Sequence, residues 1–185
     1  MVDYLSGLAT WLKGSQGGLV IPLILTLWIA WGDLRTRRIP NYLTLGTAVL
    51  GLSYNLIFHS WPGLLNGLLG LTAGFGFLIL PYIWGGMGAG DVKALAALGA
   101  WLGHRDTLFL FCYMGIAGGL MALGVLWWRG LLWQKIRAGW VLLVNLILAR
   151  PGGFEKPSSP REETPGIPYG VAIALGMVVL LGWGS

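Results

Sequence analysis

The chain of 185 residues contains little charge, since only 10% of its residues are Asp, Glu, Lys or Arg. A soluble domain of this size carries about 25% charged residues. Hydrophobic residues make up 56% of the sequence, and glycine contributes 31 positions. This composition excludes an ordinary water-soluble globule and indicates an integral membrane protein.

Cysteine and histidine are also scarce. Cys112 is the one cysteine and lies in an apolar run, which excludes a disulfide framework and a cysteine-rich zinc domain. His59 and His104 fall in predicted outer turns, far from each other, so we expect no metal site and no cofactor. The chain contains neither a G-x-S-x-G nor an H-E-x-x-H pattern, which removes the usual signatures of serine and metallo-hydrolases.

The net charge of +5 does not indicate a nucleic-acid partner. The basic residues are confined to short gaps between hydrophobic runs, and this pattern is typical of proteins oriented in a lipid bilayer. We therefore expect the bilayer itself, rather than a nucleic acid, to be the partner that the positive charges meet.

Long uncharged stretches predict an all-α polytopic membrane protein, because one span needs about 20 apolar residues. Six spans are predicted, at 15–32, 41–58, 64–84, 90–104, 107–128 and 168–184. The second and third are separated by the turn-forming cluster His59-Ser60-Trp61-Pro62-Gly63. The run 138–149 is too short to cross and is flanked by basic residues, so we interpret it as an interfacial amphipathic helix.

The basic residues orient this arrangement. Ten of the 12 fall on one side of the six spans, and only Lys13 and Arg105 fall on the other. The positive-inside rule makes the first side cytoplasmic and places both termini outside. Residues 129–167 then form a cytoplasmic loop within a single membrane-embedded domain of residues 1–185. No small-residue cleavage site follows the first apolar run, so we expect it to be retained as an anchor.

Two acidic residues differ from the other five. Asp33 closes the first predicted span, and Asp91 opens the fourth, within the glycine-rich segment Gly85–Lys93. Two complete spans separate them, which predicts that both lie at the cytoplasmic face. An ionisable group at membrane depth costs roughly 2.5 to 3.5 kcal/mol and usually lines a polar interior. Either one alone is equally well explained as a helix-end charge paired with Arg35 or Lys93. Both on one face, one of them among glycines, favour a functional pair.

Three motifs in the chain carry a family resemblance. They are Asp33-Leu34-Arg35-Thr36-Arg37-Arg38-Ile39-Pro40-Asn41, then Gly88-Ala89-Gly90-Asp91-Val92-Lys93, then Pro168-Tyr169-Gly170-Val171-Ala172. Together they resemble the type IV prepilin peptidase family of GxGD membrane aspartic proteases. The Gly-x-Gly-Asp element alone is a weak signal, and the combination of the three is specific.

The resemblance implies an endopeptidase that removes the basic leader of prepilins, pseudopilins or preflagellins at the cytoplasmic face of a prokaryotic cytoplasmic membrane. The family's two catalytic aspartates fall on Asp33 and Asp91. The implied partner is a prepilin-like single-span membrane protein. Residues matching the rest of the motifs are expected to shape the site: Gly88, Gly90, Lys93, Pro40, Asn41, Pro168, Tyr169 and Gly170.

Many members of this family also methylate the new amino terminus, through an insertion whose four cysteines bind zinc. This chain has one cysteine and no such insertion between Asp33 and Asn41, so it resembles the short, peptidase-only members. We therefore expect no methyltransferase activity.

Individual roles are less constrained. Asp91 near a helix amino terminus favours the base, and Asp33 near a helix carboxyl end favours the acid, although the neighbouring arginines act against this assignment. Lys93 either tunes the two aspartates or extends to lipid phosphate. Pro40 is expected to start the second span and Asn41 to cap it.

Residues 168–170 either present main-chain groups to a substrate or simply begin the last span. A different class of function also stays open, because a small proton- or cation-coupled transporter or assembly subunit would likewise place Asp33 and Asp91 in the membrane as a relay. A third possibility, a presenilin-like GxGD protease with other substrates, is disfavoured by the first and third motifs.

Overall fold

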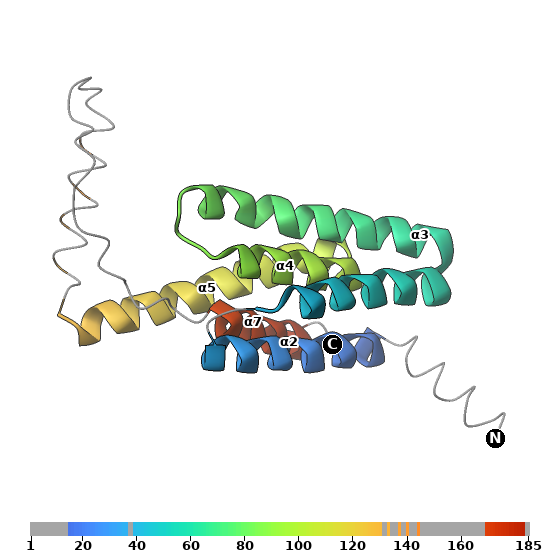
Figure 1. Ribbon diagram of the computed structural model, residues 1–185, viewed down its shortest axis with the longest axis horizontal. Helices are drawn as coiled ribbons and strands as arrows, with labels where there is room; N and C mark the ends of the chain where they lie inside the picture. The colour runs from blue at the N-terminus through green and yellow to red at the C-terminus, as the bar shows by residue number, and fades with distance from the viewer. Residues whose placement is uncertain are drawn as a thin grey trace. The chain divides into compact units, whose positions relative to one another are not determined.

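The computed structural model is helical throughout the part that it describes, with no strand among residues 15–36, 39–130 and 169–183. Isolated positions Trp133, Arg137, Trp140 and Val144 are described in addition. The helices, shown in Figure 1, are α2 (Ser15–Thr36), α3 (Asn41–Ile83), α4 (Ala89–Leu102), α5 (His104–Trp128) and α7 (Tyr169–Trp183). The predicted all-α class is confirmed for this part of the chain.

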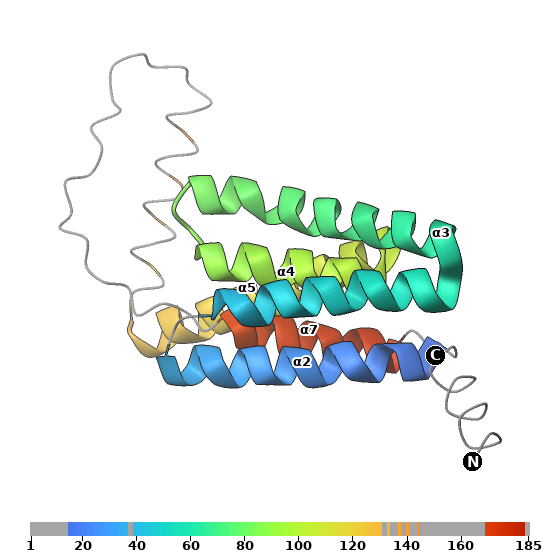
Figure 2. The same cartoon turned by 45° about the vertical axis from the view of Figure 1, so that its right-hand side comes forward.

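Helix α3 is a hairpin of two helical arms. Ser60 has φ 58° and ψ −156°, which breaks the helix between Asn41 and Ile83. The chain reverses there, and the two arms run side by side in both views (Figures 1 and 2). The break falls in the predicted turn at 59–63, so that prediction is confirmed. A non-glycine residue in this conformation is uncommon, and Pro62 follows within the same turn.

Within the described residues, three helices are long and apolar enough to cross a membrane by length and composition: Gly18–Thr36, Asn41–Ile83 and His104–Trp128. Counting the α3 arms, α4 and α7 as separate spans would give the predicted six, and that number stays a prediction. Helix α2 continues to Thr36, beyond the predicted end at residue 32. The predicted interfacial helix at 138–149 lies outside the described residues, apart from Trp140 and Val144.

Helix α4 packs between the arms of α3 through glycines. Gly51, Gly67, Gly70 and Gly74 of α3 are all buried. A Cβ atom on Gly67 would stand 2.7 Å from the Ala100 carbonyl oxygen, and one on Gly74 would stand 2.7 Å from that of Leu95. Such close backbone approach between membrane helices requires small residues. The small-residue spacing Gly70–Gly74 therefore serves the packing of α3 on α4.

The same spacing at Gly115–Gly119 has no such role in the described part of the chain. No atom lies within 4 Å of the place where a Cβ on either glycine would stand. Small-residue spacing permits close packing but does not identify the helix that supplies it.

The chain divides into two compact units. The first contains residues 1–118 and 168–185, and the second contains residues 119–167. In the first unit, α2 lies beside α7, as Figure 2 shows, and α4 also contacts α2 and α7. The Trp101 indole N–H of α4 donates a 2.8 Å hydrogen bond to the Gly18 carbonyl oxygen of α2. In the second unit, the described chain continues α5 to Trp128 and turns at Gly130, whose φ is 66°.

Candidate active site

Several helix ends of the first unit meet at one end of the bundle. Helix α2 finishes there, α3 begins and returns there, and α4 and α7 start there (Figure 2). Asp33 lies in the last turn of α2, and Asp91 lies in the first turn of α4. The two aspartates therefore share one end of the bundle, as the number of spans between them predicted.

Asp33 is 8% exposed, and its carboxylate is oriented by helix α7. Its Oδ2 accepts a 2.9 Å hydrogen bond from the backbone N–H of Gly170. A Cβ on Gly170 would stand 2.8 Å from the Asp33 Cβ and 3.0 Å from Oδ2, so glycine is the residue that this contact requires. Gly170 thus presents a main-chain donor to Asp33 in the first turn of α7, a contact that neither of the two roles left open for residues 168–170 included.

Asp91 is also 8% exposed and is oriented by its own helix start. Its Oδ2 accepts a 3.2 Å hydrogen bond from the Gly88 N–H, while the Asp91 N–H donates to the Gly88 carbonyl oxygen at 3.2 Å. Gly88 is the N-cap residue of α4, and a carboxylate in the first turn satisfies N–H groups that the helix leaves unpaired. The two carboxyl groups interact electrostatically across this end of the bundle.

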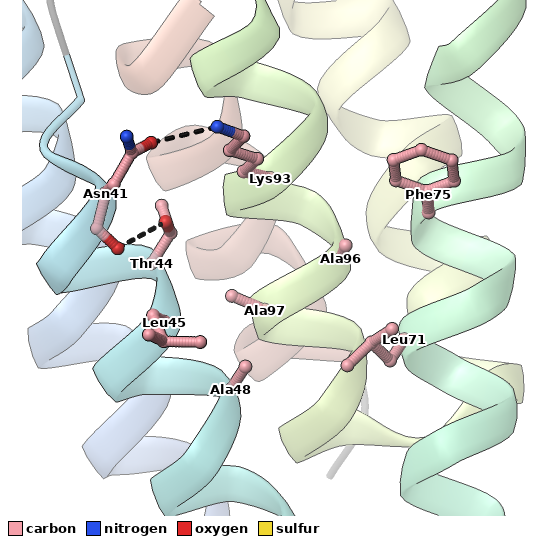
Figure 3. A pocket seen from close by; sticks show the side chains of 9 residues that line it. All are labelled: Asn41, Thr44, Leu45, Ala48, Leu71, Phe75, Lys93, Ala96 and Ala97. Atoms are coloured by element: carbon pink, nitrogen blue, oxygen red, sulfur yellow. Dashed lines mark hydrogen bonds between the residues drawn. The ribbon is translucent and has the colours of Figure 1, made fainter.

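The segment Ile39–Asn41, which leads into α3, contacts α4 on both sides of Asp91. A Cβ on Gly90 would stand 3.2 Å from the Ile39 Cβ. The Lys93 ammonium donates a 2.9 Å hydrogen bond to Oδ1 of Asn41, drawn as a dashed line in Figure 3. The first and second sequence motifs are therefore in direct contact.

Asn41 does not cap α3, contrary to the sequence-based prediction. Pro40 is the N-cap residue, with φ −65° and ψ 136°, and no side chain caps the helix start. A capping side chain belongs to the N-cap residue, and Asn41 stands one position further in, where its amide reaches Lys93 instead. Pro40 was expected to start the second span, and it is instead the N-cap residue directly before the first helical residue, Asn41.

The basic neighbours of the two aspartates have other partners in the described residues. The Arg35 guanidinium lies 5.0 Å from the centre of the Trp31 ring. Lys93 contacts Asn41, as described above.

The ring of Tyr169 packs against Gly118 of α5, where a Cβ on Gly118 would stand 3.3 Å from the Tyr169 Cε1. Pro168 lies outside the described residues.

A groove of about 310 Å³ extends from the Asn41–Lys93 hydrogen bond along α4, between the two arms of α3 (Figure 3). Its polar end is Asn41 and Lys93, and the remaining lining is largely apolar. The lining residues are Asn41, Thr44, Leu45, Ala48, Leu71, Phe75, Lys93, Ala96 and Ala97. The groove was not predicted from the sequence. The only feature of the sequence that indicates the groove is the helical spacing of small residues. This spacing identifies the groove only when both arms of α3 are known to face α4.

Comparison with known proteins decides the family. The model of the type IV leader peptidase family matches residues 20–123, more than half of the chain. The chain belongs to the type IV leader peptidase family. Both Asp33 and Asp91 fall inside the matched region, whereas Gly170, which contacts Asp33, follows it.

The curated relatives that match this chain are named prepilin leader peptidase/N-methyltransferase. The relative from Pectobacterium carotovorum is 34% identical over 140 residues, covering 71% of this chain and 48% of its own length. The Neisseria gonorrhoeae relative is 37% identical over 134 residues, covering 66% and 46%. The Aeromonas hydrophila relative is 30% identical over 168 residues, covering 90% and 43%.

The chain spans about half the length of the curated relatives it matches. No solved structure matches it significantly. Together with the three long apolar helices, family membership identifies the chain as a membrane protein.

Proposed function

We propose that this chain is an aspartic endopeptidase that removes the basic leader of type IV prepilins or related single-span proteins. One observation carries the proposal: two buried carboxylates lie at the same end of the bundle, and each accepts a main-chain N–H. The names of the curated relatives support the substrate class. We place the reaction at the cytoplasmic face of a prokaryotic cytoplasmic membrane, because the basic residues of the sequence are concentrated on that side of the predicted spans.

The chemistry needs one ionised and one protonated carboxyl group. The carboxylate takes a proton from water, and the resulting hydroxide attacks the scissile carbonyl carbon. The carboxylic acid protonates the carbonyl oxygen and recovers a proton when the tetrahedral intermediate collapses, and the proton taken from water is delivered to the leaving amine as the C–N bond breaks. Two carboxyl groups whose charges interact share a proton more readily than they both ionise, so the pair supplies both roles.

The division of roles between the two aspartates follows from their helices. Each carboxylate accepts one main-chain N–H, so this contact does not distinguish them. Asp91 lies at the amino end of α4, where the helix dipole favours negative charge, and Asp33 lies at the carboxyl end of α2, where it does not. We therefore assign Asp91 as the base and Asp33 as the acid.

The groove beside α4 offers a position for the apolar segment of the substrate. Ala48, Ala96 and Ala97 allow a helix backbone to approach closely, and small residues are the usual means of such approach in membranes. The polar end of the groove lies two residues from Asp91. A substrate helix in the groove would bring the junction between its apolar segment and its leader towards the two aspartates. Because the leader is basic like the loops of this chain, we expect recognition through main-chain contacts rather than through those loops.

We propose peptidase activity alone. The methyltransferase activity named for the curated relatives is associated, through the family resemblance, with a zinc-binding set of four cysteines. These 185 residues contain only Cys112, which cannot supply such a set.

The decisive experiment is co-expression with a candidate prepilin, with leader removal followed by a gel shift. Asp33→Asn and Asp91→Asn are each expected to abolish cleavage while the protein still inserts in the membrane. Asp106→Asn is the matched control, because Asp106 lies in the first turn of α5, away from the end where α2 finishes and α4 begins. Undiminished cleavage by either of the first two variants would remove the two-aspartate mechanism. Ion flux without cleavage would favour the transporter instead.

A further inference from the structure

We propose that Lys93 and Asn41 are positioning residues. Their hydrogen bond holds the segment between α2 and α3 against α4 and thereby fixes Asp33 relative to Asp91. This inference rests on the proposed peptidase function and assigns Lys93 a role distinct from binding substrate or lipid phosphate.

The two contacts of this segment lie on either side of Asp91. Ile39 packs against Gly90, one residue before Asp91, and Asn41 accepts the hydrogen bond of Lys93, two residues after it. Positions 90 and 93 are three residues apart and therefore share a face of α4. The segment from Ile39 to Asn41 thus lies along the first turn of α4, beside the residue that it helps to position.

The path along the chain from Asp33 to Asn41 is short enough to transmit position. Only eight positions separate Asp33 from Asn41 in the sequence. Helix α2 continues past Asp33 to Thr36, and Pro40 restricts the backbone directly before α3 begins. Asp33 is held on its other side by the Gly170 N–H. Loss of the Asn41 contact would therefore leave Asp33 attached to α7 while its distance from Asp91 became variable.

The chemistry of the bond suits a positioning role. Among the described contacts, the Lys93 ammonium donates to a neutral amide oxygen and not to either aspartate. A hydrogen bond with one charged partner is stronger than a neutral one, and the amide leaves the carboxylates free to share their proton. An ammonium that simply extended to lipid phosphate would have no need of Asn41.

Kinetics of the full-length membrane protein test the proposal. Asn41→Leu and Lys93→Met are each expected to lower kcat about 100-fold, the cost of a small misplacement of reacting groups, with KM changed less than about 3-fold. The exchanged pair Asn41→Lys with Lys93→Asn should recover at least about 10-fold of the loss, because donor and acceptor are both present again. Tyr42→Leu, next to Asn41 and 77% exposed, is the control and should match the parent chain. Unchanged kcat in Asn41→Leu, a change confined to KM, or no recovery in the exchanged pair would overturn the proposal.

A second measurement does not depend on cleavage. Spin labels on cysteines at Leu34 of α2 and Ala89 of α4, both exposed, report the separation of these helix ends in a Cys112→Ala background. The spread of distances measured by EPR should widen in Asn41→Leu and narrow again in the exchanged pair. If the parent chain cleaves no prepilin, the proposed function fails, and the EPR result alone decides the positioning role. An unchanged spread overturns that role, whether or not cleavage occurs.

Discussion

The backbone N–H of Gly170 donates a 2.9 Å hydrogen bond to the carboxylate of Asp33, across 137 positions of the chain. The start of the last described helix thus contacts the end of the first, at the end of the bundle where α4 also begins. Three motifs that are separate in the sequence become one site through this contact and through the pair Asn41–Lys93. The site therefore depends on packing between helices as much as on the two aspartates.

Gly170→Ala is expected to lower kcat about 100-fold, because the added methyl group would stand 2.8 Å from the Asp33 Cβ and displace the carboxylate. Leader cleavage at saturating substrate measures the effect. Gly32→Ala is the control, since it adds the same group next to Asp33, with no atom within 4 Å of it apart from its chain neighbours and the backbone of its own helix turn. Equal rates for the two variants would show that the contact between α7 and Asp33 has no catalytic consequence.

A proton shared between Asp33 and Asp91 predicts a bell-shaped dependence of kcat on pH. At low pH both carboxyl groups are protonated and no base is present, whereas at high pH both are ionised and no acid is present. Rates measured across the pH range should therefore pass through a maximum, and Asp106→Asn should leave its position unchanged. A rate that rises steadily to alkaline pH would contradict a shared proton.

The sequence was sufficient for the hairpin of α3 and for the shared location of the two aspartates. The turn at 59–63 contains residues that disfavour helix, and Ser60 breaks the helix there. The location follows from counting spans, which needs only hydrophobicity. The sequence places the end of α2 too early, because a charged residue such as Asp33 usually marks the end of an apolar span. A buried carboxylate with a hydrogen-bond donor is tolerated inside a helix, which here runs to Thr36.

Contacts between residues that are far apart in the sequence could not be predicted. Nothing in the sequence marks the backbone N–H of Gly170 as the donor to Asp33. An asparagine at position 41 is equally compatible with capping α3 and with binding Lys93, so the sequence does not choose between them. Glycine spacing was equally ambiguous. Gly70 and Gly74 pack against α4, whereas Gly115 and Gly119 have no neighbour within 4 Å in the described part of the chain. Only the arrangement of the helices distinguishes these cases.

Filling the groove is expected to weaken substrate binding. Ala48→Phe places a ring in the groove from the first arm of α3, so we expect KM to rise about 10-fold while kcat changes little. Val49→Phe is the matched control, because Val49 is 55% exposed and does not line the groove. If both variants have the parental KM, the apolar segment of the substrate binds elsewhere.

Close packing of α3 on α4 predicts a stability loss at Gly74. In Gly74→Ala the added methyl group would stand 2.7 Å from the Leu95 carbonyl oxygen, and overpacking of this kind costs about 1–3 kcal/mol. Thermal unfolding in detergent should show a lower midpoint than for the parent chain. Gly76→Ala, an exposed position on the same arm with nothing within 4 Å, should not lower the midpoint.

Asn55 binds the carboxyl end of α4, which is the end opposite the aspartates. Its amide nitrogen lies 3.0 Å from the carbonyl oxygens of both Ala100 and Trp101, in the last turn of α4, and its side chain is buried. The last carbonyls of a helix have no partner within it, and a membrane interior offers no water to replace one. Asn55→Leu leaves these oxygens unpaired, so we expect a loss of about 1–3 kcal/mol in the free energy of unfolding.

The loss at Asn55 should not be accompanied by a fall in kcat at temperatures where the protein stays folded, because Asp91 lies at the opposite end of α4. Ser53→Ala, at an exposed position on the same arm, is the control for both measurements. A fall in kcat without a change in the free energy of unfolding would contradict this prediction. It would mean that the placement of the carboxyl end of α4 affects the geometry of the two aspartates.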